Sequence, residues 1–157
     1  MSDVVENEAI KTLGVIIVDH GSRREESNQT LLQIVNAFRD SSPYAIVEPA
    51  HMELAEPSIA TAYGKCVRQG AVEIVIHPFF LLPGRHWDAD IPQLAAAAAA
   101  SHPQTSYLVT APLGTHPLMA EVIAERIAGC LRHGRGEMPD CPLCENTDKC
   151  TFRQAAT

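Results

Sequence analysis

Apolar and polar positions follow a repeated order along the chain, in which a short apolar run precedes a longer segment with helical spacing. The run 13–19 (LGVIIVD) is continuous and rich in β-branched residues, which is typical of a buried parallel strand. After it, Ser22 and Glu25 have the S-x-x-E spacing of a helix capping box. A helix is then predicted by apolar residues at i, i+3, i+4 and i+7, namely Leu31, Ile34, Val35 and Phe38.

The same order recurs three more times. Further strands are predicted at 45–53, 72–80 and 105–110, and further helices at 57–69, 91–101 and 118–131. Pro57 suits a first helical turn, and Gly70 suits a helix end. Strands that alternate with helices are joined by right-handed crossovers, so the pattern predicts a parallel sheet with helices on both faces. The fold class is therefore α/β, with one small four-stranded sheet.

Composition divides the chain into three parts and restricts its partners. Residues 1–12 are expected to be a flexible N-terminus, residues 13–131 form the predicted domain, and residues 132–157 are a Cys-rich tail. The formal net charge of −7 argues against a nucleic acid as partner. No apolar run approaches the length of a bilayer span, which argues against a membrane. No targeting segment is visible, and we expect the partner to be a small molecule.

Candidate metal ligands lie at the ends of the predicted strands, where open parallel sheets bind their ligands. His20 directly follows the first strand, Glu53 closes the second, and His86 lies in the loop after the third. Each alone has an ordinary interpretation, as a loop histidine, a helix-start carboxylate or a surface histidine. Together, two imidazoles and one carboxylate suit Fe²⁺, Co²⁺ or Zn²⁺. His77, inside an apolar run, is interpreted as a core histidine.

Four segments in order carry a family resemblance: DHGSRREESN, EPAHMELAEPSI, HPFFLLPGRHWDADIP and TAPLGTHPLM. Over about residues 13–131 the chain resembles the small CbiX and SirB class of sirohydrochlorin chelatases. The resemblance implies a class II chelatase fold and a homodimer of single-domain subunits. It also implies that His20, Glu53 and His86 occupy the metal-handling positions.

The activity that the resemblance implies is insertion of Fe²⁺ into sirohydrochlorin, which yields siroheme and releases two protons. His20 and His86 are assigned to metal delivery and proton acceptance, because a neutral imidazole suits both tasks. Since sirohydrochlorin carries eight carboxylates, Arg23 and Arg85 are its expected partners, together with Ser22. Two alternatives remain open. One is a cobaltochelatase of cobalamin synthesis, and the other is a non-enzymatic carrier of a tetrapyrrole or metal.

Four of the five cysteines lie near the C-terminus with the spacing C-x10-C-x2-C-x5-C, namely Cys130, Cys141, Cys144 and Cys150. The spacing alone predicts zinc or an iron-sulfur centre equally. The tail resembles that of the plant plastid sirohydrochlorin ferrochelatases, which implies a [2Fe–2S] cluster and a location in the plastid stroma. A structural zinc or a regulatory disulfide is the alternative. Cys66 is interpreted as a buried small hydrophobe.

Overall fold

The computed structural model describes residues 10–138 of the chain. Its elements follow the predicted alternation of strands and helices. In chain order they are β1 (Leu13–Asp19), α2 (Glu25–Ser41), β2 (Ile46–His51), α3 (Ile59–Arg68), β3 (Glu73–Pro78), the π-helix η1 (His86–Asp90), α4 (Ile91–Ala100), β4 (Ser106–Val109) and α5 (Leu118–Gly134). The predicted α/β class with four strands is confirmed.

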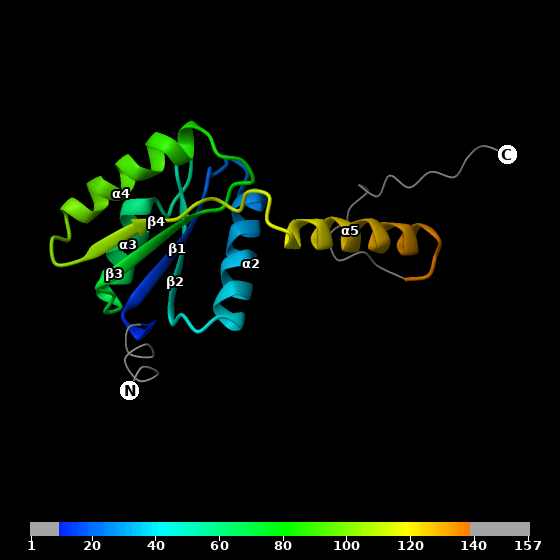
Figure 1. The fold of residues 1–157 in the computed structure, drawn as a ribbon, viewed down its shortest axis with the longest axis horizontal. Helices are drawn as coiled ribbons and strands as arrows, with labels where there is room; N and C mark the ends of the chain where they lie inside the picture. The colour runs from blue at the N-terminus through cyan, green and yellow to red at the C-terminus, as the bar shows by residue number, and fades with distance from the viewer. Residues whose placement is uncertain (1–9, 139–157) are drawn as a thin grey trace. The chain divides into compact units, whose positions relative to one another are not determined.

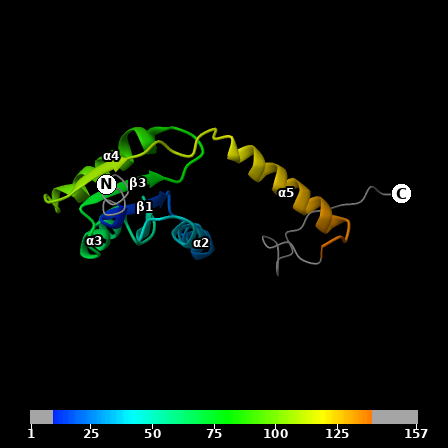
Figure 2. The same cartoon turned by 60° about the horizontal axis from the view of Figure 1, so that its bottom comes forward.

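The four strands form one parallel sheet in the order β2-β1-β3-β4. β1 is therefore central, and Figure 2 shows it running beside β3. In the register of the sheet, Asp19 at the end of β1 pairs with His51 at the end of β2. This register brings the segments that follow β1 and β2 to the same edge.

Alternate residues of β1 face two different apolar clusters, as expected for a strand buried on both faces. Ile16 and Val18 belong to the cluster that contains α3 and α4, whereas Val15 and Ile17 belong to the cluster that contains α2. Figure 1 shows α3 and α4 on one side of the sheet and α2 on the other. The prediction of helices on both faces is confirmed.

Two helix starts differ from the sequence prediction. The Ser22–Glu25 capping box does not form, because Arg24 is the N-cap of α2 and no side chain caps it. Instead, the Ser22 hydroxyl accepts a hydrogen bond from the Arg24 N–H at 3.0 Å. Pro57 lies before the N-cap Ser58 rather than in the first turn of α3. The expected end of α3 is confirmed, since Gly70 has a positive φ of 99°.

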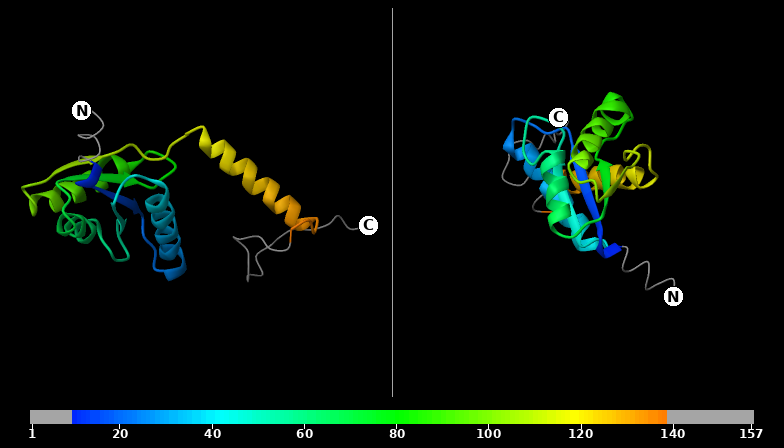
Figure 3. Two further views of the ribbon diagram at one scale, coloured as in Figure 1. Left: turned by 90° about the horizontal axis from the view of Figure 1, so that it is seen from below. Right: turned by 90° about the vertical axis from the view of Figure 1, so that its left-hand side faces the viewer.

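The chain divides into two compact units at Gly114, and each is described separately. The second unit contains α5, which Figure 3 shows as one continuous helix. None of the residues of α5 is buried, and the exposed apolar side chains of this helix include Leu118, Ile123, Ile127 and Leu131. Among residues 10–138, no helix is both long and apolar enough to span a bilayer.

Candidate functional site

The three predicted metal ligands lie close together at the carboxyl edge of the sheet. His20 Nε2 is 2.9 Å from Glu53 Oε1, and the His20 and His86 rings are 5.1 Å apart in an edge-to-face arrangement. The side chains are 42% exposed for His20, 53% for Glu53 and 47% for His86, so all three are accessible. Their role as metal ligands stays a prediction.

Backbone hydrogen bonds continue beyond the ends of β1 and β2, and they fix the first two of these residues. The Met52 N–H donates to Asp19 O at 2.8 Å, and the Glu53 N–H donates to His20 O at 3.1 Å. The chain can turn here because Gly21 has a φ of +83°. A Cβ atom on Gly21 would lie 2.0 Å from the carbonyl oxygen of Glu53. The two segments are therefore in direct backbone contact.

A hydrogen-bonded pair of side chains, one of them buried, lies at this turn. His51 is 2% exposed, and its Nδ1 donates to Asp19 Oδ1 at 2.6 Å. The same carboxylate oxygen accepts the Gly21 N–H at 2.9 Å. Asp19 thus contacts both the turn after β1 and the last residue of β2.

His86 is positioned differently, by side chains of its own loop and helix. It begins the π-helix η1, and its Nδ1 donates to Asp90 Oδ2 at 2.8 Å. Its ring stacks on Phe80 at a centroid distance of 6.2 Å. Trp87 Nε1 donates to Thr110 O at 3.0 Å, which ties the helix to the end of β4. A carboxylate on Nδ1 orients Nε2 as the metal-binding nitrogen.

The donor geometry fits a cation held first by two groups. With its proton on Nε2, His20 donates a hydrogen bond to Glu53 Oε1; with its proton on Nδ1, the Nε2 lone pair and the carboxylate oxygen are both available to one cation. His86 contacts this pair only through its ring, whose centroid is 5.1 Å from that of His20. Within residues 10–138, no group of three or more His, Cys, Asp or Glu side chains is arranged to hold a metal ion. A three-ligand site therefore requires the side chains to rotate.

The predicted substrate-binding residues lie in two places. Arg85 is next to His86, and its Nε is 3.8 Å from Asp90 Oδ1. Glu53, His86 and Asp90 border an open depression of about 410 Å³. Ser22 and Arg23 border a different depression, of about 290 Å³, together with His51 and Glu56 among others. The structure does not gather Ser22 and Arg23 with Arg85.

Glu56, three residues after Glu53, has a structural task. Its Oε2 accepts the Ser58 N–H at 2.7 Å, just before α3 begins. This backbone hydrogen bond, followed by one from the Thr61 side chain, lowers the pKa of Glu56. Glu56 therefore serves the start of α3.

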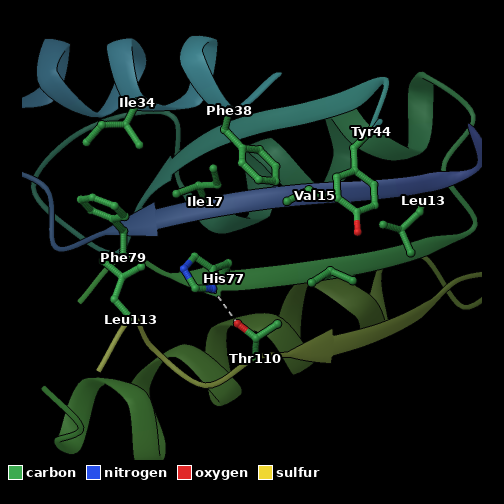
Figure 4. A pocket seen from close by; sticks show the side chains of 11 residues that line it. Leu13, Val15, Ile17, Ile34, Phe38, Tyr44, His77, Phe79, Thr110 and Leu113 are labelled. Carbon is green, nitrogen blue, oxygen red and sulfur yellow. Dashed lines mark hydrogen bonds between the residues drawn. The ribbon is translucent and has the colours of Figure 1, made fainter. Parts of the chain in front are cut away.

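A third depression, on the α2 side of the sheet, is apolar. Figure 4 shows it lined by Val15, Ile17, Phe38 and Phe79 among others, with a volume of about 360 Å³. Its titratable histidine is His77, whose Nδ1 is 2.8 Å from Thr110 Oγ1. Partial burial lowers the pKa of His77, which is half-buried and lines this depression rather than belonging to either apolar cluster.

Of the four tail cysteines, only Cys130 lies within the described residues. It is exposed on α5 and forms no disulfide with Cys66, the other cysteine of residues 10–138. Cys141, Cys144 and Cys150 lie outside the described residues. Cys66 is buried as predicted, and burial raises the pKa of its thiol to about 12.

Sequence reasoning missed three residues that hold the candidate ligands: Asp19, His51 and Asp90. Asp90 had a usable signal, because it lies four residues after His86 and i,i+4 residues meet on a helix. Asp19 and His51 are 32 positions apart, so only the register of β1 and β2 reveals their contact.

Comparison with known proteins identifies the family. The family model described as CbiX matches residues 14–130. The chain belongs to the CbiX family. The strand-end segments that carry His20, Glu53 and His86 all lie within this CbiX match.

Relatives and a solved structure agree with the CbiX assignment. The chain is 56% identical over 137 residues to the chloroplastic sirohydrochlorin ferrochelatase of Arabidopsis thaliana, covering 87% of this chain and 61% of that protein. It is 35% identical over 88 residues to a sirohydrochlorin cobaltochelatase of Methanocaldococcus jannaschii, covering 56% of this chain and 62% of that protein. The chain thus spans about three fifths of the length of these relatives.

One structural neighbour is the sirohydrochlorin chelatase SirB from Bacillus subtilis subspecies spizizenii in complex with cobalt. It superposes with a TM-score of 0.64 at 27% identity, covering 81% of this chain and 51% of that one. The predicted class II chelatase fold is confirmed.

Proposed function

We propose that the chain is a sirohydrochlorin ferrochelatase, which inserts Fe²⁺ into sirohydrochlorin to give siroheme and two protons. The observation that carries the proposal is the convergence of His20, Glu53 and His86 at one edge of the sheet. The relative at 56% identity bears the same activity in its name.

In this reaction the side chains have two tasks, which are to hold the metal ion and to accept two protons. His20 and Glu53 hold the incoming Fe²⁺, because their donor atoms already face each other across 2.9 Å. The pyrrole nitrogens of the substrate must lose two protons, and an imidazole is a suitable acceptor near neutral pH. His20 and His86 supply the two imidazoles.

Apolar and basic side chains beside these residues suit a large, flat, multiply charged ligand. Leu54 follows Glu53, and Leu81 and Leu82 lie in the loop that leads to His86; their exposures are 52%, 55% and 74%. Such leucines offer an apolar surface for a macrocycle. Arg85 is the basic side chain beside this surface. Ser22 and Arg23 bind further carboxylates at the periphery of the substrate.

Cobalt insertion is the second candidate activity. A site of two imidazoles and one carboxylate binds Co²⁺ somewhat more tightly than Fe²⁺, so the donor set admits both metals. The cobaltochelatase relative is similar over a shorter part of the chain than the ferrochelatase relative. The ferrochelatase assignment is therefore preferred.

An anaerobic absorbance assay tests the function. Sirohydrochlorin is mixed with Fe²⁺ or Co²⁺, with and without the protein, and formation of the metallated product is followed. We expect iron insertion well above the spontaneous rate, and we expect His102→Ala, a variant of a ring stacked on Tyr63, to retain it. Acceleration with cobalt alone would establish the cobaltochelatase. Tight binding of sirohydrochlorin without turnover would establish the carrier.

The tail is proposed to hold a [2Fe–2S] cluster through Cys130, Cys141, Cys144 and Cys150. The spacing and the free thiol of Cys130 support this proposal. Protein purified without oxygen should be brown and contain comparable amounts of iron and acid-labile sulfide. Cys144→Ser should lose the colour while chelation largely survives, and Cys66→Ser should keep it. A colourless protein with stoichiometric zinc would refute the cluster.

The proposed assembly is a homodimer, and the proposed location is the plastid stroma. The dimer is supported by α5, because an amphipathic helix with Leu118, Ile123, Ile127 and Leu131 exposed is typical of an interface. Light scattering should give about twice the 17.0 kDa of one chain, and Ile127→Lys should lower this mass. A monomer with full activity would refute the dimer. Fractionated plastids probed with an antibody test the location.

A further inference from the structure

We propose that Asp19 and His51 are positioning residues, whose mutual hydrogen bond sets the spacing of the metal-binding atoms of His20 and Glu53. The inference rests on the proposed function, in which these two atoms receive the metal ion. Neither Asp19 nor His51 is proposed to touch the metal or the macrocycle.

Asp19 controls the His20 side of the pair. It directly precedes His20, and its Oδ1 accepts the N–H of Gly21, the residue that directly follows. The Asp19 side chain therefore restrains the backbone on both sides of His20. Because this oxygen also receives His51 Nδ1 at 2.6 Å, the turn after β1 is tied to the end of β2.

His51 controls the Glu53 side. The loop that carries Glu53 leaves β2 at His51 and returns to it, because the His51 N–H donates to Pro57 O at 2.7 Å. An isolated bridge to Ser58 lies at the same point. Both ends of the Glu53 loop thus meet at the one residue whose ring is held by Asp19.

The burial of His51 separates this role from that of a ligand. Its side chain is 2% exposed, and its Nδ1 already donates to a carboxylate. A second buried polar residue, Glu48, contacts Lys65 at 2.8 Å and Gln69 at 2.7 Å, remote from the segments that carry the candidate ligands. The Asp19–His51 pair instead adjoins both of them. Groups that orient metal ligands in this way typically change metal affinity by about 10–100-fold.

The test measures Co²⁺ binding by the full chain, through calorimetry and the visible absorption of the bound ion. His51→Phe keeps the volume of the ring and removes the donor to Asp19. We expect it to weaken Co²⁺ binding at least about tenfold and to change the absorption pattern. A His20→Ala, Glu53→Ala double variant supplies the reference that subtracts Co²⁺ bound by tail thiolates.

Two amide variants make the test independent of folding defects in His51→Phe. Asn places an amide N–H close to the position of Nδ1, whereas Gln carries the same amide one methylene further out. We expect His51→Asn to restore most of the Co²⁺ affinity and the spectrum, and His51→Gln to behave like His51→Phe. His77→Phe is the matched control, because it removes a histidine–Thr110 hydrogen bond on β3 and should leave Co²⁺ binding unchanged.

Wild-type affinity and spectrum in His51→Phe would overturn the inference. Equal behaviour of the Asn and Gln variants, or equal damage from His77→Phe, would also overturn it, because either result would show a general effect of stability. The proposed function fails separately, if the wild-type protein binds Co²⁺ but inserts neither metal into sirohydrochlorin. A wild-type protein without Co²⁺ affinity at this site would refute both.

Discussion

The β1–β2 part of the site and the part that follows β3 hold their candidate ligands by different means. His20 and Glu53 lie within two residues of a strand end, and backbone hydrogen bonds join their segments. His86 lies eight residues after Pro78, the last residue of β3, and side chains hold it: Asp90, Phe80 and Trp87. One part of the site is built from the sheet, and the other is attached to it.

The difference matters for a chelatase, which must bind a metal ion and then release it into a ring. Atoms fixed by backbone contacts keep their spacing when the metal arrives, whereas a ligand held by side chains can follow the substrate. We therefore interpret the β1–β2 part as the fixed metal-binding part and His86 as the adjustable one. Each of the following predictions tests this contrast.

The largest effect is expected from removing an imidazole. His20→Ala and His86→Ala should each reduce metal insertion by at least about 100-fold, because the reaction loses a metal ligand or proton acceptor. Both side chains are more than 40% exposed, so the fold should persist. Insertion assays and circular dichroism check this. Near-normal turnover by either variant would remove that residue from the mechanism.

Gly21→Ala should strongly destabilise the β1–β2 part. The positive φ alone costs roughly 1–3 kcal/mol for a non-glycine residue, and the new Cβ would meet the Glu53 carbonyl. Gly84→Ala is the control after β3, because nothing lies within 4 Å of its added Cβ. Its free energy of unfolding should change by less than about 0.5 kcal/mol. Similar losses in denaturant titrations of both variants would contradict the contrast.

Asp90→Asn should have a smaller effect, confined to function. The Asn amide oxygen can still accept the Nδ1 hydrogen but lacks the negative charge, so the hydrogen bond that orients His86 weakens and metal insertion should fall by about tenfold. Asp88→Asn on the same π-helix is the matched control. Thermal unfolding should be the same for both variants. If Asp90→Asn inserts iron as fast as Asp88→Asn, the orientation of His86 does not depend on this contact.

The smallest effect concerns His77, the half-buried histidine of β3. Burial lowers the pKa of His77 from its usual value of 6.5, so the unfolded chain binds this proton more readily than the folded chain. Its contribution to stability is therefore complete above pH 6.5 and declines as the pH falls toward the lowered pKa. Denaturant titrations between pH 7.5 and about 5 should show a shallower loss for His77→Phe than for wild type. Parallel curves would contradict this.

The sequence predicted the fold well because apolar periodicity specifies buried faces. The run 13–19 became the central strand, and the helical spacing from Leu31 to Phe38 packs α2 against it. The capping box at Ser22 was wrong for a local reason. Asn28 Oδ1 accepts the Ser22 N–H, and Asn28 Nδ2 donates to Ser22 O. This pair holds Ser22 in the turn before the helix begins.

The candidate ligands were also predictable, because strand ends meet at one edge of a parallel sheet. The residues that orient these ligands were harder to predict. In the sequence, Asp19 is only the last residue of a predicted strand and His51 has no evident partner. Their contact becomes visible only when β1 and β2 are paired in register. The apolar surface of Leu81 and Leu82 was equally hidden, because a run of leucines after a strand is as typical of a core as of a binding surface.

The backbone hydrogen bonds that continue past β1 and β2 also restrict how this protein can change by insertion or deletion. Adding one residue beside His20 or Glu53 would shift the pairing and turn each side chain to the other face of the sheet. After β3, backbone hydrogen bonds continue only as far as Phe80, whose carbonyl accepts the Leu113 N–H, and residues 81–85 pair with no strand of the described sheet. Changes of length are therefore expected to be tolerated best in residues 81–85, which directly precede His86.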